Sequence, residues 1–159
     1  MQSQDYDQIW QKIKPIKTCM FTTKDGDDLR ARPMQLVQDE FDGTLYFFTE
    51  ANTPKVDEAQ QHREVCLSFA DVEDECFVSL SGMSRVNHDK RLIDKFWNPF
   101  VAAWFPEGKD SSNVTLLEID VYAAEYWDAT ANRMVQLYEI AKANVTNTEP
   151  DLGENRKFG

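Results

Sequence analysis

The residues of this chain best suited to chemistry are cations placed close together in an acidic sequence. Arg30 and Arg32 stand two positions apart in a segment with strand character, and side chains two apart on a strand leave the same face. Two guanidinium groups on one face can bind a phosphate through paired hydrogen bonds. The alternative is an exposed strand whose arginines pair with some of the many carboxylates, which is common and weak at protein surfaces.

A second cationic feature stands where a helix is expected to begin. Thr49 precedes the segment Thr53-Pro54-Lys55, and a proline at the first helical position after an Asn or Thr cap is typical of a helix start. The free N–H groups there attract anions, and a lysine in the first turn is unfavourable unless an anion lies nearby. Asp57 or Glu58 could supply that negative charge locally. Taken together with the two arginines, Lys55 favours a shared phosphate.

Other kinds of chemistry have weaker support. His62 and His88 lack Cys or carboxylate partners at metal-ligand spacing, so no metal site is expected. The serines within residues 78–84 do not match the GxSxG pattern of a nucleophile elbow, and the Gly-rich fingerprints for dinucleotides and for the P-loop are absent. No acid, base or nucleophile stands out, so the catalytic residues are unassigned.

Charge and composition narrow the partners and the compartment. The formal net charge of −11 argues against nucleic acid and anionic membranes, which are bound mainly by clustered Lys and Arg. The first residues lack the pattern of a signal peptide, and no run approaches the ~20 apolar residues of a membrane span. Cys19, Cys66 and Cys76 have no CxxC spacing and are interpreted as structural thiols in a reducing compartment. A cytoplasmic location is therefore expected.

The elements that must position the cations are mostly short strands. Apolar alternation and turn residues predict a hairpin of strands 18–23 and 29–38, then strands 44–49, 65–70, 76–86 and 114–127. Helices are predicted at 4–14, 54–62, 88–97 and 132–143, with a further helical turn at 100–105. Gly82, inside one strand, indicates a bulge or a close backbone approach. About six strands joined by tight turns favour a mainly β barrel or sandwich with added helices. One domain is expected at 1–145, followed by a polar tail at 146–159.

Several segments resemble the pyridoxamine 5'-phosphate oxidase-like family in order and spacing. They are Arg32-Pro33-Met34-Gln35, Leu45-Tyr46-Phe47-Phe48-Thr49, Pro54-Lys55 and Ser81-Gly82. A second, Trp-rich set is similar to the general stress protein group of that family: Phe96-Trp97-Asn98-Pro99, Ala103-Trp104-Phe105-Pro106 and Glu125-Tyr126-Trp127-Asp128. Together the two sets cover roughly residues 10–130.

The resemblance implies a six-stranded antiparallel split β-barrel that forms a homodimer, with FMN at the subunit interface and FAD as the alternative flavin. Arg32 and Lys55 would hold the phosphate of the flavin. Phe48 and Thr49 would lie beside the isoalloxazine ring and the ribityl chain. Backbone contacts would come from the stretch that starts with Pro33, Met34 and Gln35 and ends at Val37. Arg30 belongs to the candidate set, although only Arg32 matches the core position of the family.

The function implied by the resemblance is that of a stress-linked, flavin-dependent oxidoreductase, with a nicotinamide cofactor as a candidate electron donor. A true pyridoxamine 5'-phosphate oxidase carries a C-terminal segment with Arg and His that binds its substrate. This chain ends instead in a predicted helix and a polar tail, so vitamin B6 oxidation is not expected.

Two other functions remain open at this point. One is a module that binds, senses or stores flavin without turnover. The other is a split barrel for heme or a deazaflavin, where heme would need His62 or His88 as its ligand. The segment from Trp97 to Phe105 could cover the flavin, line the dimer interface or fill the core.

Overall fold

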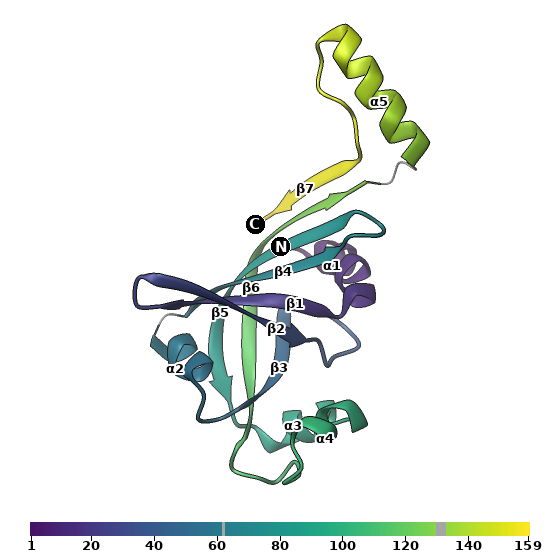
Figure 1. Cartoon of the computed structure of the whole chain (residues 1–159). Coiled ribbons are helices and arrows are strands. Elements are labelled where there is room, and N and C mark those ends of the chain that lie inside the picture. Colours follow the sequence, from purple (N-terminus) through teal and green to yellow (C-terminus); the bar gives the residue numbers. More distant parts are fainter. Residues whose placement is uncertain (62, 130–132) are drawn as a thin grey trace.

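Seven strands and five helices make up the computed structural model, which describes residues 1–61, 63–129 and 133–159 (Figure 1). The strands are β1 Thr18–Asp25, β2 Asp28–Gln35, β3 Thr44–Glu50, β4 Glu64–Asp71, β5 Cys76–Asn87, β6 Val114–Asp128 and β7 Glu154–Phe158. The helices are α1 Ser3–Ile16, α2 Pro54–Gln61, α3 Lys90–Phe96, α4 Pro99–Trp104 and α5 Arg133–Thr146. Helix α2 begins at Pro54, as the Thr-Pro-Lys segment predicts.

The strands form one antiparallel sheet in the order β2-β1-β4-β5-β6-β3, with β7 also paired to β6. β3 pairs with the first half of β6 and β7 with its last residues. Figure 1 shows α3 and α4 at one end of the molecule and α5 at the opposite end. No helix in the described part of the chain has the length and apolar character needed to cross a membrane.

Buried and exposed side chains alternate along the strands, and the buried ones form the main core. β1 buries Cys19, Phe21 and Thr23, while the residues between them are more exposed. In the register of the hairpin, Arg32 lies opposite Phe21 and Arg30 opposite Thr23. Residues directly opposite each other in an antiparallel pair share a face. Both arginines therefore lie on the face that β1 turns inward, as their spacing predicts.

A second, smaller core lies on the other face of β3. Leu45 and Phe47 belong to the main core, whereas Tyr46 and Phe48 contact a cluster that includes Ile93 and Phe96 of α3. Tyr46 and Phe96 are in ring contact, with centroids 5.0 Å apart. Both faces of β3 are covered, and its central residues, Leu45–Phe48, are accordingly all apolar or aromatic.

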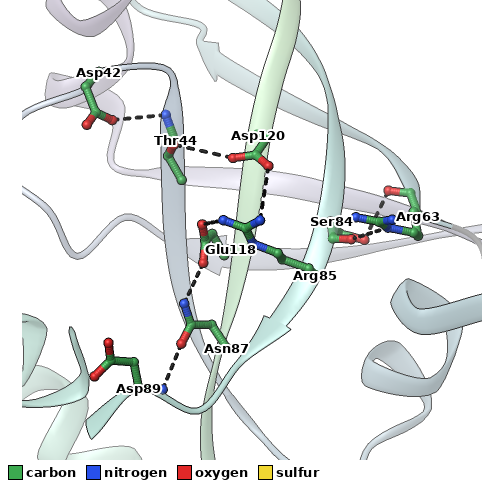
Figure 2. Close-up of polar contacts among 9 residues, drawn as sticks. All are labelled: Asp42, Thr44, Arg63, Ser84, Arg85, Asn87, Asp89, Glu118 and Asp120. Carbon is green, nitrogen blue, oxygen red and sulfur yellow. Dashed lines mark hydrogen bonds and ion pairs between the residues drawn. The ribbon is translucent and has the colours of Figure 1, made fainter. Parts of the chain in front are cut away.

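A polar network fixes the place where α3 begins (Figure 2). The buried carboxylate of Glu118, on β6, accepts hydrogen bonds from Arg85 and from Asn87 Nδ2. Asn87 Oδ1 in turn accepts the backbone N–H of Asp89 at 2.7 Å, and Asp89 caps α3. Burial raises the pKa of the Glu118 carboxyl, but the bonds from Arg85 and Asn87 and the Arg85 charge outweigh burial, so the net pKa is lowered. The network thus ties α3 to the sheet through an ionised carboxylate.

The predicted mainly β, antiparallel fold with added helices is confirmed, but the predicted number of six strands was wrong. The additional strand, β7, lies inside the segment 146–159 that was predicted to be a polar tail. Its sequence is polar except for Phe158, which packs against the main core with its ring 6.0 Å from that of Tyr126. A single apolar residue in a polar run gives no periodic signal, so only pairing with β6 reveals the strand.

The predicted irregularity at Gly82 is confirmed and generates a stability prediction. The β5–β6 register shifts between Ser81 and Gly82, and a Cβ at Gly82 would lie 2.6 Å from Ile119 Cγ2 and 3.0 Å from the backbone oxygen of Asp120. We expect Gly82→Ala to lower the free energy of unfolding by about 1–3 kcal/mol, because the added methyl overpacks this approach. Ser81→Ala serves as the control and should change it by less than about 0.5 kcal/mol. Urea unfolding measures both, and equal stabilities would contradict the close approach.

Candidate functional site

A cavity of about 490 Å³ is lined by residues of β2, β3, α2 and α4. Its volume falls within the range of about 300–1,000 Å³ that is usual for small-molecule sites. Six of the eight residues predicted for the site line it: Pro33, Met34, Gln35, Phe48, Thr49 and Lys55. The sequence segments that come together here are the end of β2, the end of β3 and the start of α2. The structure therefore brings three separate motifs to one cavity.

Arg32 is not among the residues that line the cavity, although the next residue, Pro33, is. A closed set of hydrogen bonds holds its side chain. Its guanidinium donates to Glu58 Oε1 at 2.7 Å and to Thr23 Oγ1 at 2.8 Å. The hydroxyl of Thr23 donates in turn to Glu58 Oε2. Thr23 and Glu58 are both buried, with 1% and 6% of their surfaces exposed. Arg32 thus joins β1, β2 and α2 at one end of the barrel.

Lys55 brings a positive charge to the cavity without a carboxylate partner. Its Nζ lies 3.6 Å from Met34 Sδ, which is a weak acceptor, and it makes no ion pair with any carboxylate of residues 1–61, 63–129 or 133–159. Burial lowers the pKa of Lys55, the nearby Arg32 charge lowers it further, and Glu50 acts in the opposite direction. Two cations are therefore held near each other, and Glu58 neutralises only Arg32.

Thr49 presents a second unsatisfied group to the same cavity. The residue is 2% exposed, and its Oγ1 has no hydrogen-bond partner within the described part of the chain. Leaving a buried hydroxyl unpaired costs about 1–3 kcal/mol, and such groups are uncommon in folded proteins. Since Thr49 lines the cavity, a ligand placed there could supply the missing partner.

Arg30 does not lie in the cavity wall. Its side chain is 57% exposed and pairs with Asp25 of the same hairpin at 3.3 Å. This is the surface arrangement that the sequence left open as an alternative for the two arginines. The two neighbouring arginines thus have different surroundings: Arg32 is anchored beside the cavity, while Arg30 forms an exposed pair.

The sequence left open whether the segment from Trp97 to Phe105 covers a ligand, lines an interface or fills the core, and the structure places part of it in the cavity wall. Phe100, Val101, Trp104 and Phe105 all line the cavity, and Trp104 is 69% exposed with its ring centroid 6.4 Å from that of Phe100. Trp97, by contrast, packs edge-on against Phe48 in the second core at 5.6 Å. The segment therefore packs against the smaller core at both of its ends, through Trp97 and Phe105, and lines the cavity from Phe100 to Phe105. The signal in the sequence was the spacing of Phe100 and Trp104, two aromatic residues four positions apart on a helix of six residues.

The other reactive side chains offer no competing site in the part of the chain that is described. No group of three or more His, Cys, Asp or Glu there could hold a metal ion. His88 Nδ1 lies 2.9 Å from the buried Thr115 Oγ1, and His62 lies outside the described residues. Burial raises the pKa of the Cys19 thiol to about 12, so this cysteine stays protonated and inert.

Comparison with known proteins assigns the chain to a family. The family model described as pyridoxamine 5'-phosphate oxidase like matches residues 4–151, and the chain belongs to that family. The resemblance to its general stress protein group is also confirmed, since similar solved structures carry that description. The split β-barrel of these proteins is the architecture found here.

Three individual proteins illustrate the similarity. A candidate general stress protein 26 from Jannaschia sp. CCS1 is 25% identical, superimposes with a TM-score of 0.76 and covers 99% of each chain. The general stress FMN/FAD binding protein from Xanthomonas citri is 30% identical, with a TM-score of 0.72 and coverage of 82% of this chain and 93% of that one. Protein bli-3 from Neurospora crassa is 25% identical over an alignment of 153 residues, which covers 89% of this chain and 73% of the relative.

The charge of Lys55 generates a prediction about pH and stability. Because the pKa of Lys55 is lower in the folded chain than its unfolded value of about 10.4, charged Lys55 costs the folded state free energy. That cost is complete below the folded pKa and disappears as the pH rises to the unfolded value. Without ligand, we expect Lys55→Met to be more stable than the wild type at pH 7. The difference should shrink towards pH 10.

Lys109→Met provides the control for this experiment. A hydrogen bond from Lys109 to Asp94 raises the pKa of Lys109, which lies at the surface. Its loss should therefore be neutral or slightly destabilising at pH 7. Urea unfolding at several pH values measures both variants. A Lys55→Met variant that is less stable than the wild type at pH 7 would contradict the unpaired charge.

The unpaired hydroxyl of Thr49 generates a separate prediction. We expect Thr49→Val, which replaces the hydroxyl by a methyl group of similar size, to raise the stability of the ligand-free chain by about 1 kcal/mol. Thr115→Val is the matched control, because Thr115 Oγ1 is buried but bonds to Asn87 O and to His88. That variant should lose stability. Thermal unfolding distinguishes the two, and equal losses would show that Thr49 has a partner.

Proposed function

We propose that the cavity binds FMN and that the chain is a flavin-dependent oxidoreductase. The observation that carries this proposal is the pair of neighbouring cations, Arg32 and Lys55, of which only Arg32 has a carboxylate partner within the described residues. Lys55 lines the cavity and Arg32 lies beside it, and two neighbouring like charges are unfavourable unless an anion joins them. A phosphate group of the ligand would provide that anion.

The remaining lining fits the other parts of FMN. The aromatic and apolar wall of Phe48, Val101 and Phe105 suits a flat ring system. The Thr49 hydroxyl, which has no partner in the described residues, suits the hydroxyl-rich ribityl chain. The backbone of Pro33, Met34 and Gln35 runs along the same cavity. Each type of group in the ligand thus meets a group of matching chemistry.

The redox activity is proposed from the cofactor and not from reactive side chains. FMN, when bound, supplies electron or hydride transfer, while the protein contributes binding, orientation and electrostatics. The residues that line the cavity include Lys55 and Glu50 as ionisable groups. Lys55 is assigned to the phosphate, so no general acid or base is assigned. The proposed electron donor is a nicotinamide cofactor.

A homodimer is part of the same proposal. Phe100 and Trp104, at the cavity wall, are 50% and 69% exposed. Large exposed aromatic residues next to a cavity are typical of surfaces that a partner or a ligand covers. A second copy of the chain would shield the aromatic side of the cavity from water.

Titration with FMN tests the proposed function. We expect saturable quenching of flavin fluorescence with the wild type, and an affinity lowered by about tenfold to hundredfold in Lys55→Met, which loses one charge-assisted hydrogen bond to phosphate. Riboflavin, which lacks the phosphate, should bind both proteins equally. Lys109→Met is the control for loss of a surface lysine and should bind FMN as the wild type does. A wild type that binds neither flavin would refute the proposal.

The same preparation tests turnover. Bound FMN should be reduced by NADH or NADPH and reoxidised by an acceptor, as followed by the flavin absorbance. Tight binding without any reduction would favour a module that binds or stores flavin without turnover.

A further inference from the structure

The hydrogen-bonded group of Thr23, Arg32 and Glu58 is complete without any ligand. Each member contacts the other two: Arg32 donates to both, and the Thr23 hydroxyl donates to Glu58. The members come from β2, β1 and α2, so the group forms only when the helix closes this end of the barrel. Its geometry is therefore set by the fold before a ligand arrives.

Stability alone is a weak reason for this arrangement. Glu58 is 6% exposed and the Arg32 side chain 21% exposed, and removing such charges from water costs much of what their attraction returns. Apolar residues of similar volume often stabilise a protein as well as a buried ion pair does. The group does not line the cavity but adjoins it, because Arg32 precedes the lining residue Pro33 in β2 and Glu58 lies one turn after the lining residue Lys55 in α2. This position points to a role in binding.

The hydrogen-bonding capacity of Arg32 is only partly used. A guanidinium has five N–H donors in a fixed plane, and here one Nη1 bond and one Nη2 bond go to Thr23 and Glu58. The remaining donors are left for another acceptor. Because two bonds to different residues fix the plane of the group, the direction of those donors is fixed as well.

We propose that Thr23 and Glu58 are positioning residues that hold Arg32 in the orientation required to bind the phosphate of the ligand. The inference rests on the proposed function, because it takes the anion between Arg32 and Lys55 to be a phosphate. A long, flexible arginine loses rotational freedom when it binds an anion. Here that freedom is already lost in the folded chain, so less affinity is lost on binding.

A competing role for Glu58, in which it draws Arg32 away from the phosphate, predicts the opposite change in FMN affinity. If Glu58 simply competed with the phosphate for Arg32, loosening the group would free the guanidinium and tighten FMN binding. If Glu58 positions Arg32, loosening the group weakens FMN binding. The two roles thus differ in the sign of the change in affinity, provided that the number of charges is kept constant.

Thr23→Val keeps the charges constant and removes the hydroxyl that accepts a hydrogen bond from Arg32 and donates one to Glu58, while the direct bond from Arg32 to Glu58 can remain. We expect its affinity for FMN to fall about fivefold to tenfold, and its affinity for riboflavin to stay unchanged. Thr23→Ser, which retains the hydroxyl, should restore FMN binding. Glu58→Asp is the second variant, because its shorter carboxylate cannot reach both Thr23 and Arg32. Its FMN affinity should fall as in Thr23→Val. It tests the proposal even if Thr23→Val does not fold.

Fluorescence titration with FMN and with riboflavin, together with urea unfolding of each variant, separates the outcomes. A lower affinity for FMN but not for riboflavin in Thr23→Val and Glu58→Asp, together with normal FMN binding in Thr23→Ser, supports the positioning role. Equal loss for both flavins would overturn it, because it would indicate a general structural defect. Unchanged or tighter FMN binding would also overturn it, while leaving the proposed function intact. If the wild type binds neither flavin, the proposed function itself is refuted, and this outcome is distinct from those above.

Discussion

The candidate site centres on the unfavourable placement of Lys55, whose charge is partly buried and lies near the charge of Arg32. The fold holds these two cations near each other where water is partly excluded, and the pKa of Lys55 is lowered by burial and then by the Arg32 charge. Glu58 neutralises Arg32, but no carboxylate of the described residues pairs with Lys55. Within an acidic chain of net charge −11, carboxylates were available to relieve this repulsion. The arrangement therefore leaves Lys55 without an ion pair among the described residues, with only the longer-range charge of Glu50 acting in its favour.

The rest of the structure keeps this unfavourable arrangement in place. The β1–β2 pairing sets Arg32 opposite the buried Phe21, and α2 closes the same end with Glu58 and Lys55 one turn apart. On the other side of the cavity, the network around Glu118 ties the start of α3 to the sheet (Figure 2). α3 is followed by α4, which supplies the aromatic wall. Packing on both faces of β3 offsets the cost of the unpaired groups that face the cavity.

The sequence could predict whatever depends on local patterns. The hairpin, the strand at Thr44–Glu50, the start of α2 at Pro54 and the convergence of six candidate residues all follow from alternation, turn chemistry and the family motifs. Contacts between distant segments could not be read in this way. Glu58 was considered only as a partner for Lys55, yet it pairs with Arg32, which is 26 positions away. β7 was missed because its pairing with β6, and not its own sequence, makes it a strand.

The two ends of the cavity differ in rigidity, and this difference bears on what each end can recognise. Beside the end that Lys55 lines, hydrogen bonds join three elements through Thr23, Arg32 and Glu58. The aromatic end is formed by a helix of six residues with Trp104 largely exposed. Preorganised polar groups give affinity and orientation, whereas an exposed aromatic surface accepts flat ligands of many kinds. A flavin anchored at the charged end would therefore present its ring at the side of the cavity that is open to a second molecule. Specificity for the cofactor and access for the substrate would then reside at opposite ends of one cavity.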